Sequence, residues 1–160
     1  MLTGIAHDRT LLQRLEGAIA RADALKQRCA LLTLKISNFE ALAAEFGREA
    51  ADRALVVSAS LLRRAATDID LEARVGEYHF ALLLEGPTTA EHAMNRAQEL
   101  VARGLRPTTA LPGGAAVKFH VAVALLPHEG LDAKASLQWL LDAVNAMPPE
   151  ARKVIRAMNF

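Results

Sequence analysis

The sequence predicts an α/β (α+β) fold in which helices cover one central sheet, and three observations lead to this class. The chain has 160 residues, a length that supports one hydrophobic core and would be crowded with two. Stretches with apolar residues at helical spacing alternate with short apolar runs that are typical of buried strands. One hairpin signal lies near the middle, so we expect strands that are separated by helices and pair around a single hairpin.

The chain is expected to begin with a helix and a buried strand. Leucine and alanine recur at helical spacing over about residues 8–27, and Asp8 can cap the start of this helix. The run over 30–36 is short and almost entirely apolar, which is typical of a strand buried on both faces. Lys35, near its end, is the one charged residue in this run.

Two helices are expected after this strand. Asn38 stands where it can cap the short segment FEALAAEF, and Gly47 follows that segment as a C-terminal stop. A longer helix then carries an apolar stripe over about residues 51–65.

A β-hairpin is expected next, with strands over 71–75 and 79–85. Between them lie Gly76 and Glu77. Glycine followed by another residue suits a two-residue type II′ turn, because glycine tolerates the positive φ of the first turn position.

The second half alternates helix, strand and helix. Thr88 and Glu91 form a capping box for a helix that Gly104 ends. A long strand is expected over 116–125, after the loop-like stretch that precedes it. Asp132 then caps the last clear helix.

The end of the chain completes the expected layout. Pro148 and Pro149 end the last helix, and residues 150–160 are expected to add one more helical piece. The split β-α-β order resembles a ferredoxin-like or palm core. No repeat or linker divides residues 1–160, so we expect a single domain.

Composition excludes several classes of protein. With 19 basic and 18 acidic residues, the formal charge is +1, so a strongly basic face for nucleic acid or an anionic membrane is not expected. Apolar runs such as Val121–Pro127 are far shorter than the roughly 18 residues that span a bilayer. Asp8 and Arg9 interrupt the N-terminus, so no signal peptide is expected. The single cysteine, Cys29, fits a reducing compartment, and we expect a cytoplasmic location.

Short motifs in a fixed order carry a resemblance to a known family. They are Leu2-Thr3-Gly4, Asp8-Arg9, Lys35-Ile36-Ser37-Asn38-Phe39, Phe46-Gly47, Asp52, and Arg74-Val75-Gly76-Glu77-Tyr78-His79-Phe80. Their order and spacing resemble a GGDEF domain, the diguanylate cyclase module of bacterial cyclic-di-GMP signalling. The likeness covers residues 2 to about 147 and leaves a tail over 148–160. It implies the mostly antiparallel central sheet of the nucleotidyl cyclases.

The resemblance also implies a chemistry. Two such domains face each other, each holding one GTP, and each 3′-hydroxyl attacks the α-phosphate of the other nucleotide. Divalent metal ions neutralise the phosphates and activate the hydroxyl. Such hard cations need carboxylate oxygens, which the family takes from the end of its first strand and from the acidic pair of its signature.

This sequence departs from the family at those positions. Lys35 and Ser37 replace the two acids of the first strand, and Tyr78 and His79 replace the acidic pair of the signature. Gly76 is kept, but Glu77 replaces the second glycine of the signature. One unit charge contributes about 4 kcal/mol at about 4 Å and an effective dielectric of about 20, so these exchanges should abolish metal binding. We therefore expect no metal, no cofactor and no cyclase activity.

The family's nucleotide sites are also altered. In the guanine pocket Asp52 is kept, while Ala43 and Ala51 replace the family's asparagine and glycine. In the product-inhibition site Asp70 is kept, while Thr67 replaces the arginine that would grip phosphates. Arg64, one turn earlier, is a candidate to reach that site instead.

Several residues have two readings on sequence alone. Lys35 either pairs with a phosphate in place of the metal or is solvated and idle, and Asp52 either recognises guanine or caps a helix. Tyr78 is either an exposed anchor for a partner protein or lies over Lys35 in a cation–π contact. His79 and His120 are expected on the strands that flank Lys35.

Three further residues receive structural readings. Arg74 is expected to pair with an acid on the hairpin. Trp139 is either a core residue or an interface anchor, and Cys29 is expected to be inert.

These observations favour a catalytically inactive GGDEF-like domain that acts as a regulatory or protein-interaction module. The partner would be another protein or an attached signalling domain. The alternative is a sensor that binds GTP or cyclic-di-GMP weakly, through Asp52 and Lys35, and controls an attached domain. An active cyclase with Glu77 as a substitute ligand is a third hypothesis, and a homodimer is left open.

Overall fold

The computed structural model describes residues 6–67 and 69–160. Its elements run in the order β1 (Ala6–His7), α1 (Asp8–Ala24), β2 (Cys29–Ile36), α2 (Phe39–Phe46), α3 (Arg48–Ala65), β3 (Leu71–Arg74), β4 (His79–Leu84), α4 (Ala90–Gly104), a short 3-10 turn η1 (Pro112–Gly114), β5 (Phe119–Leu126), α5 (Ala133–Asn145) and β6 (Ile155–Ala157). The predicted motif Leu2-Thr3-Gly4 lies outside the described residues.

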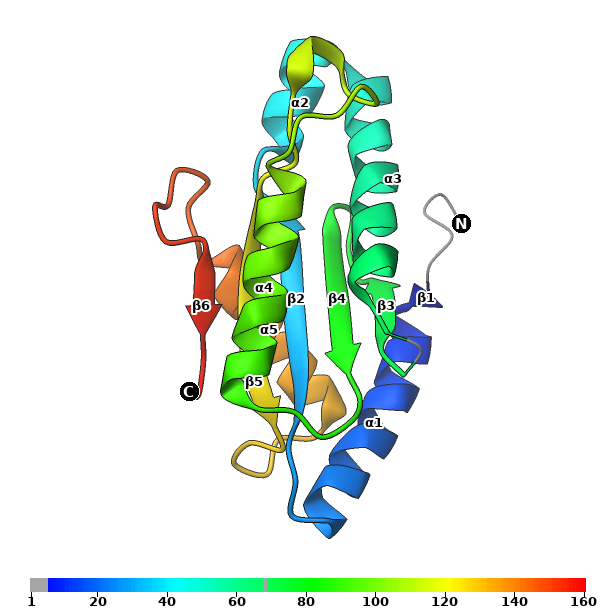
Figure 1. The fold of residues 1–160 in the computed structure, drawn as a ribbon, viewed down its shortest axis with the longest axis vertical. Coiled ribbons are helices and arrows are strands. Elements are labelled where there is room, and N and C mark those ends of the chain that lie inside the picture. Colours follow the sequence, from blue (N-terminus) through cyan, green and yellow to red (C-terminus); the bar gives the residue numbers. More distant parts are fainter. Residues whose placement is uncertain (1–5, 68) are drawn as a thin grey trace.

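The strands form one six-stranded sheet in the order β1-β3-β4-β2-β5-β6 (Figure 1). The four inner strands pair antiparallel, β3 with β4, β4 with β2, and β2 with β5. The outer strands β1 and β6 pair parallel with their neighbours. The predicted fold class, a mostly antiparallel sheet with covering helices, is therefore confirmed.

Helices cover both faces of this sheet and produce two cores. Because side chains alternate along a strand, Leu32 and Leu34 of β2 pack with α2, α3 and α4, of which α3 and α4 lie in front of the sheet in Figure 1. Cys29 and Leu31 of the same strand face the opposite way and pack with α1 and α5. This strand is buried along its whole length, as its apolar sequence predicts.

Three local predictions about helix ends differ from the structure. The first helix ends at Ala24 and does not reach Gln27. The cap of α4 is Thr89, whose side chain accepts from the His92 N–H, because the helix begins one residue later than the predicted cap Thr88 allows. Asn38 precedes α2 as predicted, but its side chain makes no cap bond there.

The hairpin and the tail also differ. Three residues separate Val75 and His79, which are joined by a backbone hydrogen bond of 2.9 Å, and Gly76 is not among the residues with positive φ. The turn is therefore not the predicted two-residue type II′ turn. The tail, predicted as helical, contributes the strand β6, because the open edge of β5 offers its backbone groups to residues 155–157.

Two further predicted helix ends are confirmed, whereas the last helix, predicted to end at Pro148 and Pro149, already ends at Asn145. Gly47 adopts φ 90° between α2 and α3, a conformation that glycine tolerates. Asp132 accepts from the Ala135 N–H at 2.8 Å and caps α5.

Among the described residues, no helix combines the length and the apolar character needed to cross a membrane.

Candidate functional site

The candidate site lies where β2 ends, and the alternation of this strand decides which helix its side chains meet. Thr33 and Lys35 occupy the same face as Cys29 and Leu31, so both side chains point toward α5. The Thr33 hydroxyl donates to the Leu140 carbonyl at 2.8 Å, in the middle of that helix. Lys35 reaches the segment that follows the end of α5.

The Lys35 ammonium is buried and engaged. The residue is only 7% exposed, and Nζ donates to the Met147 carbonyl oxygen at 2.6 Å. Burial lowers the pKa of this lysine, because the charged form loses hydration. The reading of Lys35 as solvated and idle is therefore wrong.

Two histidines flank Lys35 across the sheet, as the sequence predicts. His79 of β4 and His120 of β5 are its direct partners in the two strand ladders. Since directly opposed residues share a face of the sheet, both imidazoles lie toward α5. The His79 Nε2 lies 2.7 Å from the Asn145 side-chain oxygen.

Both imidazoles are held toward the neutral form. Burial lowers the pKa of His79, its hydrogen bond to Asn145 opposes that shift, and the nearby Lys35 charge adds to it. Burial and then Lys35 lower the pKa of His120, which is 2% exposed. The His120 Nδ1 has no hydrogen-bond partner among the described residues. A cation and two neutral rings thus occupy the end of the inner strands.

The Tyr78 ring is held between two neighbouring rings. Its ring stacks on Phe39 with centroids 4.9 Å apart, and on its neighbour His79 at 4.6 Å. It packs against the core beneath α2, α3 and α4. Tyr78 is therefore neither an exposed anchor nor a cation–π partner of Lys35.

The hairpin that carries the signature is stabilised by hydrogen bonds from Arg74 to two carbonyl oxygens of its turn. Arg74 donates to the Gly76 carbonyl at 3.1 Å and to the Glu77 carbonyl at 2.6 Å. The prediction that Arg74 pairs with an acid is wrong, because the tight turn aims two carbonyls at its guanidinium.

Arg48, at the start of α3, bridges two residues of interest. Its guanidinium lies 3.2 Å from a carboxylate oxygen of Asp52 and 3.2 Å from one of Glu77. The Asp52 carboxylate is therefore paired with Arg48. Neither predicted role of Asp52, guanine recognition or helix capping, includes this ion pair. These pairs are exposed to solvent, so each contributes little to stability.

Ser37 and Asn38 hold the strand end against the start of β5. The Ser37 hydroxyl donates to the Lys118 carbonyl at 2.8 Å. The Asn38 side chain donates to the Ala116 carbonyl at 2.9 Å and accepts from the Lys118 N–H at 3.0 Å. These bonds explain why Asn38 does not cap α2 with its side chain.

A hollow of about 270 Å³ lies beside this strand end. Lys35, Ser37, Tyr78 and Asn145 are among the residues that line it. The structure thus brings together Lys35, Ser37 and Tyr78 around one small cavity. Asp52 is not among its lining residues, and neither is either histidine.

The donor set at this strand end does not fit a divalent metal. Mg²⁺ and Ca²⁺ need several carboxylate or carbonyl oxygens, whereas the polar side chains around the hollow are an ammonium, a hydroxyl, a phenol, an amide and the single carboxylate of Glu40. Across the described residues, no group of three or more histidine, cysteine, aspartate or glutamate side chains could hold a metal ion. These residues therefore do not support a metal-dependent step.

The predicted inhibitory site is occupied by a buried arginine. Arg96 of α4 lies 3.0 Å from the Asp70 carboxylate, and both side chains are almost fully buried. Arg96 also donates to the Ala65 carbonyl, and the Thr67 N–H donates to Asp70 at 3.0 Å. Asp70 is thus committed to a structural pair, and Arg64 does not reach it.

Sequence reasoning missed four residues that shape the site: Arg48, Arg96, Asn145 and Met147. Arg96 carries a signal, because it falls among Ala93, Ala97 and Leu100 on the apolar stripe of its helix. A charged residue on a buried stripe predicts a buried partner. The Met147 carbonyl could not have been found, since no side-chain pattern marks it.

The structure also decides the roles of Trp139 and Cys29. Trp139 is half-buried, packs against the core beneath α1 and α5, and stacks on His128 with centroids 4.6 Å apart. Cys29 is buried, and burial raises the pKa of its thiol to about 11, as expected for an inert cysteine.

The chain matches a known family over nearly its whole length. The family described as "Diguanylate cyclase, GGDEF domain" matches residues 1–152. A diguanylate cyclase of Vibrio cholerae serotype O1 is 30% identical over 99 residues, which are 62% of this chain and 30% of that protein. The chain therefore spans less than a third of the length of this relative.

Solved structures share the fold. The GGDEF domain of PA1120 (YfiN or TpbB) from Pseudomonas aeruginosa superposes with a TM-score of 0.87 at 25% identity, covering 99% of each chain. The GGDEF domain of DgcB from Caulobacter crescentus, in complex with c-di-GMP, has a TM-score of 0.86 at 20% identity and covers 98% of this chain and 93% of that one. The diguanylate cyclase SiaD from Pseudomonas aeruginosa, in complex with its activator SiaC, has a TM-score of 0.81 at 22% identity and covers 99% and 60%. The chain belongs to the GGDEF domain family of cyclic-di-GMP signalling.

Proposed function

We propose that this GGDEF domain is catalytically inactive and acts as a regulatory or protein-interaction module. The observation that carries the proposal is the buried Lys35, whose ammonium donates to the Met147 carbonyl where the family resemblance implies a metal-binding carboxylate. A cation fixed at that point repels Mg²⁺ and removes a negative ligand at the same time.

The signature hairpin supports the same conclusion. Tyr78 stacks on Phe39 against the core. His79 is hydrogen-bonded to Asn145, and burial lowers its pKa. Neither residue therefore offers an anionic oxygen. Glu77, the carboxylate of the signature itself, pairs with Arg48. A single engaged carboxylate does not form a two-metal site, so the hypothesis of a substitute-ligand cyclase has the least support.

An interaction role agrees with what related proteins do. SiaD has been solved in complex with its activator SiaC, so a protein that shares this fold has a protein partner. For the present chain, the partner would be another protein or an attached signalling domain.

The test is direct. The chain is incubated with GTP and either Mg²⁺ or Mn²⁺, and cyclic-di-GMP is measured by chromatography, with a GGDEF domain of intact acidic signature as the positive control. We expect no product above the protein-free background. Turnover at a rate near that of the control would overturn the proposal.

A nucleotide sensor is the second candidate, because a hollow lined by Lys35 and Ser37 persists at the strand end. It has less support, since Lys35 and Asp52 already have partners. Calorimetry with GTP and with cyclic-di-GMP separates the two roles. Heat that disappears in Asp52→Ala or Lys35→Met would favour the sensor, and the absence of heat at millimolar ligand would favour the interaction role.

A further inference from the structure

A second hollow, of about 440 Å³, lies between α3 and the C-terminal end of α4. Its apolar lining includes Val56, Val57 and Leu61 of α3, and three arginines, Arg64, Arg103 and Arg106, also line it. It shares no lining residue with the hollow beside Lys35. The helices that form it run side by side in front of the sheet (Figure 1).

The apolar part of this groove reaches solvent. Val56 is 42% exposed, although it lies in a helix whose buried stripe supplies much of one core. Arginine is enriched at protein–protein interfaces, and here arginines lie beside an exposed apolar side chain in one groove.

The charged residues that line the groove are all arginines. Arg64 and Arg106 have no side-chain hydrogen bond or ion pair with any described residue, while Arg103 pairs with Glu99 at 2.7 Å. No aspartate or glutamate is among the lining residues. The chain as a whole carries a formal charge of only +1, so positive charge is concentrated locally at this groove and favours an acidic occupant.

The groove is also preformed. Gly104, at the end of α4, lies so close to the backbone of Val117 that an added Cβ would be 2.6 Å from the Val117 carbonyl oxygen. Arg53 of α3 donates to the Ala110 carbonyl at 3.1 Å. This bond links α3 to the loop after α4, which also carries Arg106. A partner would therefore not need to order this surface, which lowers the entropic cost of binding.

We propose that this groove docks an acidic amphipathic helix of a partner protein. A third helix fits the groove between two packed helices by the same ridge-and-groove packing that joins them. Its apolar residues contact Val56, Val57 and Leu61, and its carboxylates pair with Arg64 and Arg106. The inference deepens the proposed interaction role and rests on it, but its assay reads peptide affinity and not GTP turnover, so either can fail alone.

The test uses a fluorescein-labelled helical peptide with leucines on one face and glutamates on the other. Binding is followed by fluorescence anisotropy, with a matched peptide in which lysines replace the glutamates. We expect the glutamate peptide to bind with an affinity that falls as salt rises, and the lysine peptide not to bind.

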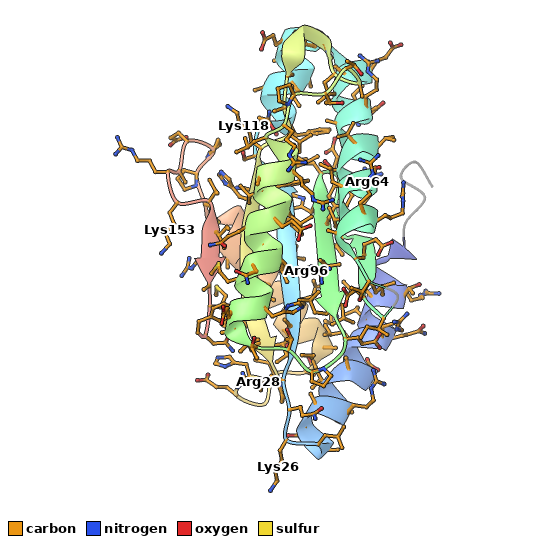
Figure 2. All side chains as sticks on the ribbon, viewed as in Figure 1. Lys26, Arg28, Arg64, Arg96, Lys118 and Lys153 are labelled. Atoms are coloured by element: carbon orange, nitrogen blue, oxygen red, sulfur yellow. The ribbon has the colours of Figure 1, made fainter. Side chains whose placement is uncertain are left out.

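Variants then locate the site. Arg64→Glu combined with Arg106→Glu should weaken binding at least about tenfold, and Arg64→Gln with Arg106→Gln should weaken it less. The control, Arg152→Glu with Lys153→Glu, makes the same change of charge just before β6, where Lys153 lies on the side of α4 away from α3 (Figure 2), and should leave affinity within about twofold. Circular dichroism verifies that every variant is folded.

Four results would overturn the proposal: no binding of the glutamate peptide, equal binding of the lysine peptide, equal weakening by the control variant, or loss of peptide binding when millimolar pyrophosphate or cyclic-di-GMP is added at constant ionic strength. The last result would identify the groove as a phosphate site and not as a helix-docking surface.

Discussion

The Nζ of Lys35 lies 2.6 Å from the carbonyl oxygen of Met147, just beyond the end of α5. This contact joins the end of the central strand β2 to the chain that leaves the last helix. A carbonyl after a helix C-terminus carries partial negative charge, so it stabilises an ammonium and repels a carboxylate. The residue that departs most from the family's chemistry has thus become part of the packing between the sheet and α5.

Replacing Lys35 tests this structural role. Lys35→Asp should lower the free energy of unfolding by at least about 3 kcal/mol, because it places an unpaired carboxylate in a buried site that faces a carbonyl oxygen. Lys35→Met substitutes an uncharged side chain of similar length. It should cost less, about 1–2 kcal/mol, because only the Met147 carbonyl is left without its hydrogen bond. Urea unfolding measures both, and an aspartate variant as stable as the methionine variant would contradict the assignment.

The two histidines beside Lys35 predict sensitivity to acid. Both have folded-state pKa values below the ordinary 6.5, so the unfolded chain binds protons more readily than the folded chain. Stability from this source is complete above about pH 6.5 and is lost as pH falls through that value toward the lower folded pKa. The charged groups nearby are Lys35 for both rings and Glu77 for His79.

The measurement compares free energies of unfolding at several pH values between about 7 and about 5, the range in which these histidines change their charge. The double variant His79→Gln with His120→Gln should lose stability less steeply over this range than the wild type. His92→Gln, at an exposed position on α4, serves as the control and should follow the wild type. Equal slopes for all three proteins would mean that the two buried rings do not cause the loss.

The Arg96–Asp70 pair is expected to be a principal anchor between α4 and the start of β3. Both side chains are less than a tenth exposed, so removing one partner leaves the other charge buried. Asp70→Asn should therefore cost about 3–5 kcal/mol. Glu99→Gln, in the more exposed pair with Arg103, should cost no more than about 1 kcal/mol. Urea unfolding of the two variants would contradict this if their losses were similar.

The sequence carries enough information for the sheet and for the neighbours of Lys35. The apolar run of β2 and the hairpin ahead of β4 indicate two inner strands, and the strand register then brings His79 and His120 beside Lys35. The prediction for the tail is wrong because residues 155–157 become a strand only when the edge of β5 is available for pairing. A short segment has no periodicity that reveals such a partner.

The contacts of the site are less predictable for a related reason. Arg96 and Asp70 are 26 positions apart, and Lys35 and Met147 are 112 positions apart, so local pattern says nothing about their pairing. Tyr78 cannot be assigned to a face until the length of the turn is known, since one residue more or less reverses the alternation. Spacing predicts elements, whereas these contacts depend on the packing of elements against one another.

The thiol of Cys29 should be unreactive in the folded protein. The residue is 1% exposed and its pKa is raised to about 11, so little thiolate forms at about pH 8 and a reagent has little access to it. Ellman's reagent should label the native chain slowly at that pH and label it at once in guanidinium chloride. Rapid and complete labelling under native conditions would show that the β2–α1 side of the core opens readily.

Two glycines in helices should respond to alanine with opposite signs. At Gly104 an added Cβ would lie 2.6 Å from the carbonyl oxygen of Val117, a backbone atom just ahead of β5, so Gly104→Ala must displace α4 from this segment and should cost about 1–3 kcal/mol. At Gly17 the nearest atom is the tip of the flexible Arg21 side chain at 3.3 Å. Gly17→Ala should therefore stabilise α1 by up to about 1 kcal/mol through helix propensity. Thermal unfolding of the two variants should show midpoints on either side of the wild type, and a rise for Gly104→Ala would disprove the close approach of α4 to the segment that leads into β5.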